Sequence, residues 1–237
     1  MPRLYLVRHG QTVFNVQKLV QGRCDAPLTD LGRAQARVAG TWLHDHGVRF
    51  DHAYSSPAAR ACDTLEIIRK TQVELEMAPL LEKAGVDAAT FAELTRAHDI
   101  ALAGAPAAIP YMRLPGLAEH YYGTFEGRPW DELPASPWTP GDAMVPFGGE
   151  AQAEAEERIS SALLGVMDLP GHENVLAVAH GCITAAFRRV WAKHAQCDQD
   201  TPLDNCCILV FEYDRATRTF SNVETVNHDF SDLEVGA

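Results

Sequence analysis

The pattern of apolar positions predicts strands that alternate with helices along most of the chain. Short continuous apolar runs, such as Leu4-Tyr5-Leu6-Val7, are typical of strands buried on both faces. Between these runs, apolar residues recur at helical spacing and predict amphipathic helices. We expect strands over 3–8, 52–55, 174–179, 207–213 and 219–226, helices over 30–46, 87–103, 150–167 and 182–194, and a further helix beginning at Ser56-Pro57.

This order of elements predicts an α/β fold, a three-layer α/β/α sandwich with a mainly parallel central sheet that the last two strands close as a hairpin. Thr29 is expected to cap one helix, and the Ser56 hydroxyl another, with Pro57 at its first helical position. In such sheets, ligands bind beyond the carboxyl ends of the strands. We therefore look for chemistry where the strands end.

Two stretches interrupt the regular pattern. The segment 128–149 is rich in prolines, which exclude regular structure, and also carries Trp130, Trp138 and Phe147. Loops of this length are usually functional or disordered. The aromatic residues favour an ordered lid, although they could equally plug the core. We expect one domain over 1–237, with cap segments inserted at about 83–113 and 128–149.

Composition limits the partners that this chain can have. Its 237 residues, 46% hydrophobic and 22% charged, are typical of a globular protein. No stretch approaches the ~20 apolar residues of a membrane span, and we find no secretory signal, so we expect a cytoplasmic protein. The net charge of −12 disfavours nucleic acid and anionic membranes. It does not forbid a small anionic substrate, because a pocket can carry a local field of opposite sign.

The six cysteines predict neither a disulfide framework nor a zinc site. They form no CxxC pair, and reduced thiols are the simplest interpretation. Cys182 lies close to a histidine and could be a nucleophile, but it lacks a base and an orienting group of its own, so we favour a packing role. His44-Asp45-His46 could suggest a metal site, yet at a charged helix end it is more typical of a solvated surface.

Two histidines follow apolar strands. Arg8-His9-Gly10 ends the first strand, and His180-Gly181 follows the strand over 174–179. A single histidine after a strand is most often structural. Two of them with an arginine at hand suit the binding of a phosphoryl group and a nucleophilic attack on its phosphorus.

Several further motifs occur in order along the chain. They are Arg8-His9-Gly10, Thr12-x-x-Asn15, Pro27-Leu28-Thr29-x-x-Gly32, Ser55-Ser56-Pro57-x-x-Arg60-Ala61, Glu119-x-x-x-Gly123-x-x-Glu126-Gly127, Gly148-Gly149-Glu150 and Ala179-His180-Gly181. Singly these motifs are weak, but their order is specific. The series, from residue 3 to about 190, resembles the histidine phosphatase superfamily, which includes the cofactor-dependent phosphoglycerate mutases. The resemblance implies a phosphoglycerate mutase-like fold.

The resemblance also implies roles for individual residues. His9 would be the nucleophile, Glu119 the general acid, and His180, as an imidazolium, would complete the pocket. The phosphate would be bound by Arg8, Asn15, Arg60 and His180. The mechanism requires no metal and no organic cofactor.

Alternatives to these roles remain open. Both arginines could be partners in surface ion pairs, Asn15 a turn former and Glu119 a solvated carboxylate. Glu82 is a rival for the general acid, because a long stretch separates the Arg60 helix from Glu119. We prefer Glu119 because Gly123 and Glu126-Gly127 follow it at the family's spacing.

The resemblance leaves phosphatase and mutase to be separated. A mutase needs added cations for the carboxylate of a phosphoglycerate, but Arg128 is the only arginine or lysine within 120–149, and Arg188-Arg189 is expected to face solvent. We therefore favour a phosphatase for small phosphate monoesters, with a mutase as the alternative and a non-catalytic phospho-ligand binder as a third hypothesis. An apolar lid would favour a hydrophobic or sugar moiety. A homodimer is possible.

Overall fold

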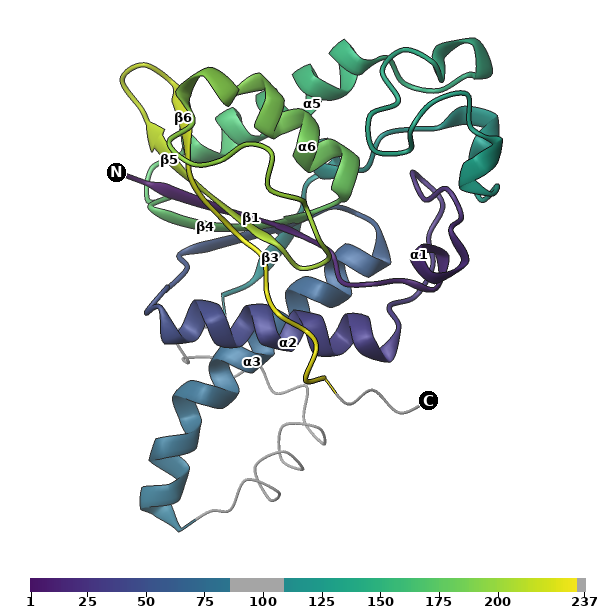
Figure 1. The fold of residues 1–237 in the computed structure, drawn as a ribbon. Coiled ribbons are helices and arrows are strands. Elements are labelled where there is room, and N and C mark those ends of the chain that lie inside the picture. The colour runs from purple at the N-terminus through teal and green to yellow at the C-terminus, as the bar shows by residue number, and fades with distance from the viewer. Residues whose placement is uncertain (86–108, 234–237) are drawn as a thin grey trace.

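The computed structural model describes residues 1–85 and 109–233, which contain a six-stranded sheet in the order β3-β2-β4-β1-β5-β6 (Figure 1). Strand β1 pairs in parallel with β4, β4 with β2, and β2 with β3. On the other side of β1, strands β5 and β6 are antiparallel and form the predicted hairpin. The strands are β1 (Arg3–Arg8), β2 (His52–Ser55), β3 (Tyr111–Arg113), β4 (Asn174–Ala179), β5 (Ile208–Asp214) and β6 (Thr219–Val226).

Helices cover both faces of the sheet and complete three layers (Figure 1). Helices α2 and α3 pack on one face, and α5 and α6 pack on the other. Within the described residues the α-helices are α1 (Val13–Gln17), α2 (Asp30–Asp45), α3 (Ala59–Ala84), α5 (Gln152–Met167) and α6 (Gly181–Val190), with short 3-10 turns at η1 (Pro115–Leu117), η2 (Gly123–Phe125), η3 (Trp130–Glu132), η4 (Val145–Phe147) and η5 (Ala192–His194). The predicted α/β sandwich is confirmed.

Strand β1 shows why the sheet needs both layers. Its side chains point alternately to opposite faces, as in any strand. Leu4 and Leu6 enter the core under α5 and α6, whereas Tyr5 and Val7 enter the core over α2 and α3. All four are buried, so a continuous apolar run is what this central strand requires.

The starts of two helices test the capping predictions. The Thr29 side chain accepts a hydrogen bond from Gly32 N at 3.0 Å, so the predicted cap of α2 is confirmed. The prediction for Ser56-Pro57 is wrong, because α3 begins at Ala59. The Ser56 hydroxyl instead lies 2.6 Å from His180 Nε2, and this contact fixes it to the neighbouring strand end.

Only part of the first expected cap segment, 83–113, lies within the described residues. The helix expected over 87–103 lies outside the described residues. Tyr111–Arg113 of the predicted 83–113 segment form β3 at the edge of the sheet, so this part belongs to the core domain. Among the described helices, none combines the length and the apolar character needed to cross a membrane.

Candidate active site

The carboxyl ends of β1 and β4 bring two of the predicted residues together. Arg8 and Ala179 are register partners in neighbouring parallel strands, and the chain leaves both strands at histidines. The rings of His9 and His180 meet edge to face with their centroids 5.1 Å apart. Both side chains are buried, so this strand end holds two imidazoles away from bulk water.

His9 is held in one tautomer. Its Nδ1 lies 2.7 Å from Gly10 O, and because a carbonyl can only accept, Nδ1 must donate its hydrogen there. The other nitrogen, Nε2, then carries a lone pair. Burial, followed by the charges of Arg60 and Arg8, holds the pKa of His9 well below its usual value. His9 is therefore a neutral imidazole with Nε2 available as a nucleophile.

His180 is also neutral, which overturns the expected imidazolium. Arg60 Nε donates to His180 Nδ1 at 3.0 Å, so Nδ1 is an acceptor and the hydrogen of this ring lies on Nε2. That nitrogen donates to Ser56 Oγ. Burial, followed by the charge of Arg60, lowers the pKa of His180 well below its usual value. The ring therefore carries no positive charge, and its one N–H is already used by Ser56. His180, which we expected to bind phosphate, does not line the pocket described below.

Arg60 lies behind the pocket and is completely buried. Besides His180, its guanidinium donates to Cys24 O and Asp25 Oδ1, each at 2.9 Å, and to two more backbone carbonyls in the same loop. These contacts use its donors fully. Arg60 thus fixes the 21–25 loop and His180. It does not line the pocket, but its positive charge lowers the pKa of both His9 and His180.

Arg8, in contrast, lines the pocket and keeps a free donor. One of its terminal nitrogens donates to Leu203 O at 2.6 Å, and the guanidinium carbon lies 4.8 Å from the centre of the Trp138 ring. Its Nε is buried without a hydrogen-bond partner among the described residues. A buried unpaired donor is costly, and an anion in the pocket would satisfy it.

A capping box at the start of α1 fixes the side-chain amide of Asn15. Thr12 N donates to Asn15 Oδ1 at 3.0 Å, and Asn15 N donates back to the Thr12 side chain. Because the side-chain oxygen is used in this capping box, the amino group is left to face the pocket that Asn15 lines. An Nδ2 donor suits a phosphate oxygen.

Glu119 is bound at the N-terminus of α6. Its Oε1 accepts from His120 N and Ile183 N, both at 2.8 Å, and Oε2 accepts from Cys182 N at 3.0 Å. Burial raises the pKa of Glu119, although these three N–H groups oppose the shift. The carboxyl is thus fixed in the pocket wall and disposed to hold a proton. The rival Glu82 is exposed in the last turn of α3.

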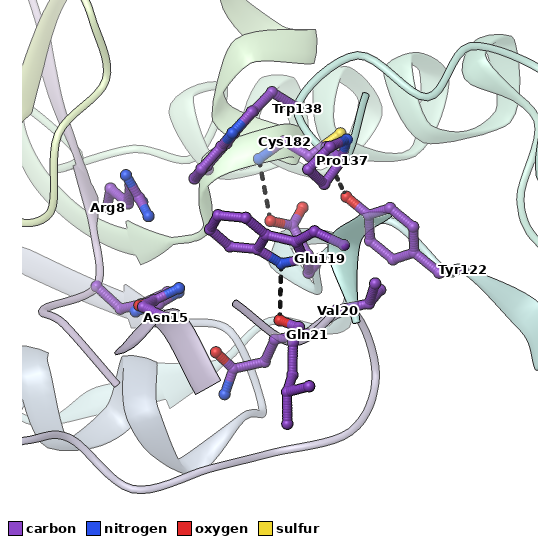
Figure 2. A pocket seen from close by; sticks show the side chains of 13 residues that line it. Arg8, Asn15, Val20, Gln21, Glu119, Tyr122, Pro137, Trp138 and Cys182 are labelled. Atoms are coloured by element: carbon purple, nitrogen blue, oxygen red, sulfur yellow. Dashed lines mark hydrogen bonds between the residues drawn. The ribbon is translucent and has the colours of Figure 1, made fainter. Parts of the chain in front are cut away.

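Four of the predicted residues and part of the 128–149 segment line one pocket (Figure 2). Its open volume is about 40 Å³, and Arg8, His9, Asn15 and Glu119 line it together with Trp130 and Trp138. The two tryptophan rings lie 5.8 Å apart, edge to face. The predicted lid is therefore an ordered wall, although Met144 of the same segment is fully buried in a small core of its own.

Sequence reasoning missed Gln21, which also lines the pocket. Its Oε1 accepts from the Thr12 hydroxyl at 2.7 Å, while Nε2 is buried without a partner among the described residues. Its place in the loop between Asn15 and Asp25 is the only signal that could have pointed to it.

Two glutamates of the motif series hold loops together outside the pocket. Glu126 accepts hydrogen bonds from Gly22 N, Arg23 N, Cys24 N and Tyr122 N, which fastens the 22–24 loop to the Glu119 segment. Glu150 forms a two-bond ion pair with Arg158 at 2.7 and 2.8 Å. These two glutamates thus stabilise the loops around the site and do not line the pocket.

A sequence model of the histidine phosphatase superfamily (branch 1) matches residues 4–82 and 75–225, nearly the whole chain. This chain belongs to the histidine phosphatase superfamily. A probable phosphoglycerate mutase GpmB from Salmonella paratyphi B is 28% identical over 240 residues, which cover 100% of this chain and 97% of that protein. The predicted family is therefore confirmed.

Solved structures agree with this superfamily fold. A phosphoglycerate mutase from Bacillus anthracis superposes with a TM-score of 0.69 at 21% identity, covering 95% of this chain and 92% of the other. A phosphoserine phosphatase from Entamoeba histolytica, in complex with 3-phosphoglyceric acid, gives 0.65 at 21% identity, covering 96% and 98%. The sheet and its helices are thus those of phosphoglycerate mutase-like proteins.

Proposed function

We propose that this chain is a phosphatase that hydrolyses small-molecule phosphate monoesters through a phosphohistidine on His9. The observation that carries the proposal is the neutral His9 ring, whose Nδ1 is tied to Gly10 O at 2.7 Å and whose Nε2 is thereby a nucleophile. Around it lie the unpaired Nε of Arg8 and the amide of Asn15. These donors suit the equatorial oxygens of a transferring phosphoryl group.

In the first step, His9 Nε2 attacks phosphorus while the bond from phosphorus to the ester oxygen breaks. The leaving oxygen takes the proton of the Glu119 carboxyl, whose raised pKa supports this role. The products of this step are a free alcohol, a Glu119 carboxylate and a phosphohistidine. The Gly10 carbonyl, which accepts from Nδ1, stabilises the positive charge that develops on the ring.

In the second step, water attacks phosphorus and gives one proton to the Glu119 carboxylate. The bond between phosphorus and Nε2 breaks, its electron pair returns to His9, and inorganic phosphate leaves. The enzyme is thus restored with neutral His9 and protonated Glu119. Arg60 and His180 do not line the pocket, but they support both steps. Arg60 fixes the His180 ring by a hydrogen bond, and that ring packs edge to face against His9.

The mutase alternative draws on the 28% identical relative, which is named a probable phosphoglycerate mutase. A mutase must bind a substrate carboxylate close to the phosphoryl site. Arg128, the one arginine of the 120–149 segment, pairs with Glu132 at 2.5 Å and does not line the pocket. Among the described residues that line the pocket, Arg8 is the only arginine or lysine, so a carboxylate held beside the phosphoryl group would have no cation of its own, which favours hydrolysis. The structural neighbour from Entamoeba histolytica is a phosphoserine phosphatase, which supports the same class of reaction.

The deciding experiment combines turnover with trapping of the intermediate. The protein is assayed against p-nitrophenyl phosphate and a panel of phosphate monoesters, and against interconversion of phosphoglycerates. We expect ester hydrolysis, an acid-labile phosphoryl label on His9 in rapidly quenched samples, and a His9→Ala variant with only background turnover.

Three results would contradict the proposal. Normal turnover by His9→Ala would exclude the nucleophile, and a label on another residue would relocate it. Interconversion of phosphoglycerates much faster than their hydrolysis would favour the mutase.

A further inference from the structure

A second cavity adjoins the phosphate pocket. It lies between α6 and the loop that precedes β5, and its open volume is about 340 Å³. Its walls are mostly apolar and include Ala185, Pro202 and Leu203. Arg8, Trp138 and Gly181 line both cavities, so the two spaces share one wall.

The sizes of the two cavities differ in a way that matters for a substrate. The phosphate pocket, at about 40 Å³, has room for about three water molecules by the same measure, which suits a phosphoryl group and little more. Small-molecule sites usually measure about 300 Å³ or more, and the second cavity reaches that size. The organic part of an ester therefore needs space outside the first pocket.

The shared wall lies beside the proposed acid. Glu119, the proposed acid, is bound by Cys182 N, and the preceding residue, Gly181, lines both cavities. A side chain at position 181 would collide with Trp138, since an added Cβ would approach its ring to 2.6 Å. The backbone and the indole thus lie in close contact at the junction.

Arg188 gives the second cavity a charge. Contrary to the expectation that it faces solvent, its half-buried side chain lines the cavity, with one bond to Thr201 O at 2.7 Å. Among the residues that the structure describes, none forms an ion pair with Arg188. The carboxylates of Asp198 and Asp200 act on the charge of Arg188, and Asp204 lies across the cavity. All three are exposed, so water screens them. Arg189 is exposed and pairs with Glu156 instead.

We propose that this second cavity binds the organic part of the substrate, and that Arg188 there pairs with an acidic group on it. The substrate class is a phosphate monoester with an apolar body that carries a carboxylate or a second phosphate. Its body contacts Ala185, Leu203 and Trp138, and its second anion meets the guanidinium. This inference rests on the proposed phosphatase activity and narrows it.

The test uses a matched pair of substrates, phenyl phosphate and 4-carboxyphenyl phosphate, which differ only in the acidic group. The Arg188→Ala variant is expected to raise KM for the carboxylated ester about tenfold and KM for phenyl phosphate much less, at similar kcat. Arg188→Lys is expected to restore part of the loss. Arg189→Ala, which removes the neighbouring exposed charge, is the control and is expected to change neither KM.

A second variant tests the cavity itself. Ala185→Leu adds bulk to the wall of this cavity and is expected to raise KM for both aryl esters. Inhibition by inorganic phosphate, which needs only the phosphate pocket, is the control. Equal KM values for wild type and Ala185→Leu would exclude the cavity as the site of the organic group. An equal effect of Arg188→Ala on both esters would overturn its proposed pairing with an acidic group.

Failure of the inference can be told from failure of the proposed function. If the wild-type protein hydrolyses both esters and the variants do not discriminate, only the inference fails. If the wild-type protein hydrolyses neither ester and forms no phosphohistidine, the proposed function fails and the inference fails with it.

Discussion

The two sides of the proposed phosphate pocket are built differently. On the sheet side, Arg60, His180 and Glu119 are held by bonds to several segments, and nearly every polar atom has a partner. On the lid side, Trp130 and Trp138 present rings, and Trp138 is 40% exposed. The contrast teaches that the sheet side fixes the reacting groups, whereas the lid side offers contact area that can change with the substrate.

The largest effect is expected from Glu119 on the sheet side. Glu119→Gln cannot donate a proton to the leaving oxygen, so kcat for alkyl phosphates is expected to fall by about 10² to 10⁴. In the first turnover, the loss for p-nitrophenyl phosphate is expected to be much smaller, because its leaving group needs no proton. The second step, in which Glu119 accepts a proton from water, slows for both esters, so the burst of alcohol or p-nitrophenol released in the first turnover measures the difference.

The matched control for this prediction is Glu82→Gln, which changes an exposed glutamate in the last turn of α3. Its rates are expected to equal those of the wild type. A strong loss in Glu82→Gln alone would show that the acid is assigned to the wrong glutamate.

Glu126 joins the 22–24 loop to the segment that carries Glu119. In Glu126→Gln, one of the two oxygens that accept from Gly22, Arg23, Cys24 and Tyr122 becomes an amino group facing N–H donors. We expect a loss of about 2 kcal/mol in the free energy of unfolding. Denaturant titration measures it. Glu132→Gln, which removes an exposed ion pair with Arg128, is the control and is expected to change stability by less than about 0.5 kcal/mol.

On the lid side, Trp138→Ala is expected to raise KM for aromatic esters about fivefold with little change in kcat. The variant removes the ring that stacks on Arg8 at 4.8 Å and walls the pocket. Phe147→Ala is the control, because this ring has similar exposure but does not line the pocket. A collapse of kcat in Trp138→Ala would mean that the lid also positions the reacting groups.

The smallest effect concerns pH. In the proposed mechanism His9 reacts as the neutral form, and its pKa lies below the usual value, so hydrolysis is expected to show no loss from His9 near pH 6.5. Glu119 is proposed to act as the protonated form, and its pKa is raised. The ratio of the alkyl to the p-nitrophenyl rate is therefore expected to fall as pH rises through that pKa. Measuring the ratio cancels the ionisation of the phosphate, and Glu119→Gln is expected to flatten it.

Much of the fold could be predicted because its central elements are long and strongly patterned. The first strand, the second strand and α2 were placed within a residue, since buried runs and helical spacing are local signals. Helix α1 and strand β3 escaped because five and three residues carry no period. The start of α3 was misplaced because Ser56 bonds to His180, a partner far away in the sequence.

For the site, too, local motifs could be read from the sequence, whereas contacts between distant residues could not. Motif order pointed to His9, Arg8, Asn15 and Glu119, which all line one pocket. The protonation of His180 could not be predicted, because it depends on burial and on the position of Arg60 Nε in the folded chain. The half-buried place of Arg188 was missed because sequence alone does not tell which face of a polar helix end meets a loop.

The position of the first strand has a consequence for biosynthesis. Strand β1 is made first, yet it lies between β4 and β5, so it has no hydrogen-bonded neighbour until residues 174–214 have emerged. Until then its apolar run stays uncovered, and the groups proposed to bind phosphate remain dispersed along the nascent polypeptide. Contacts so distant in sequence form slowly. The proposed phosphate affinity is therefore a property of the finished sheet, and a ribosome-bound fragment that stops before β4 is expected to lack it.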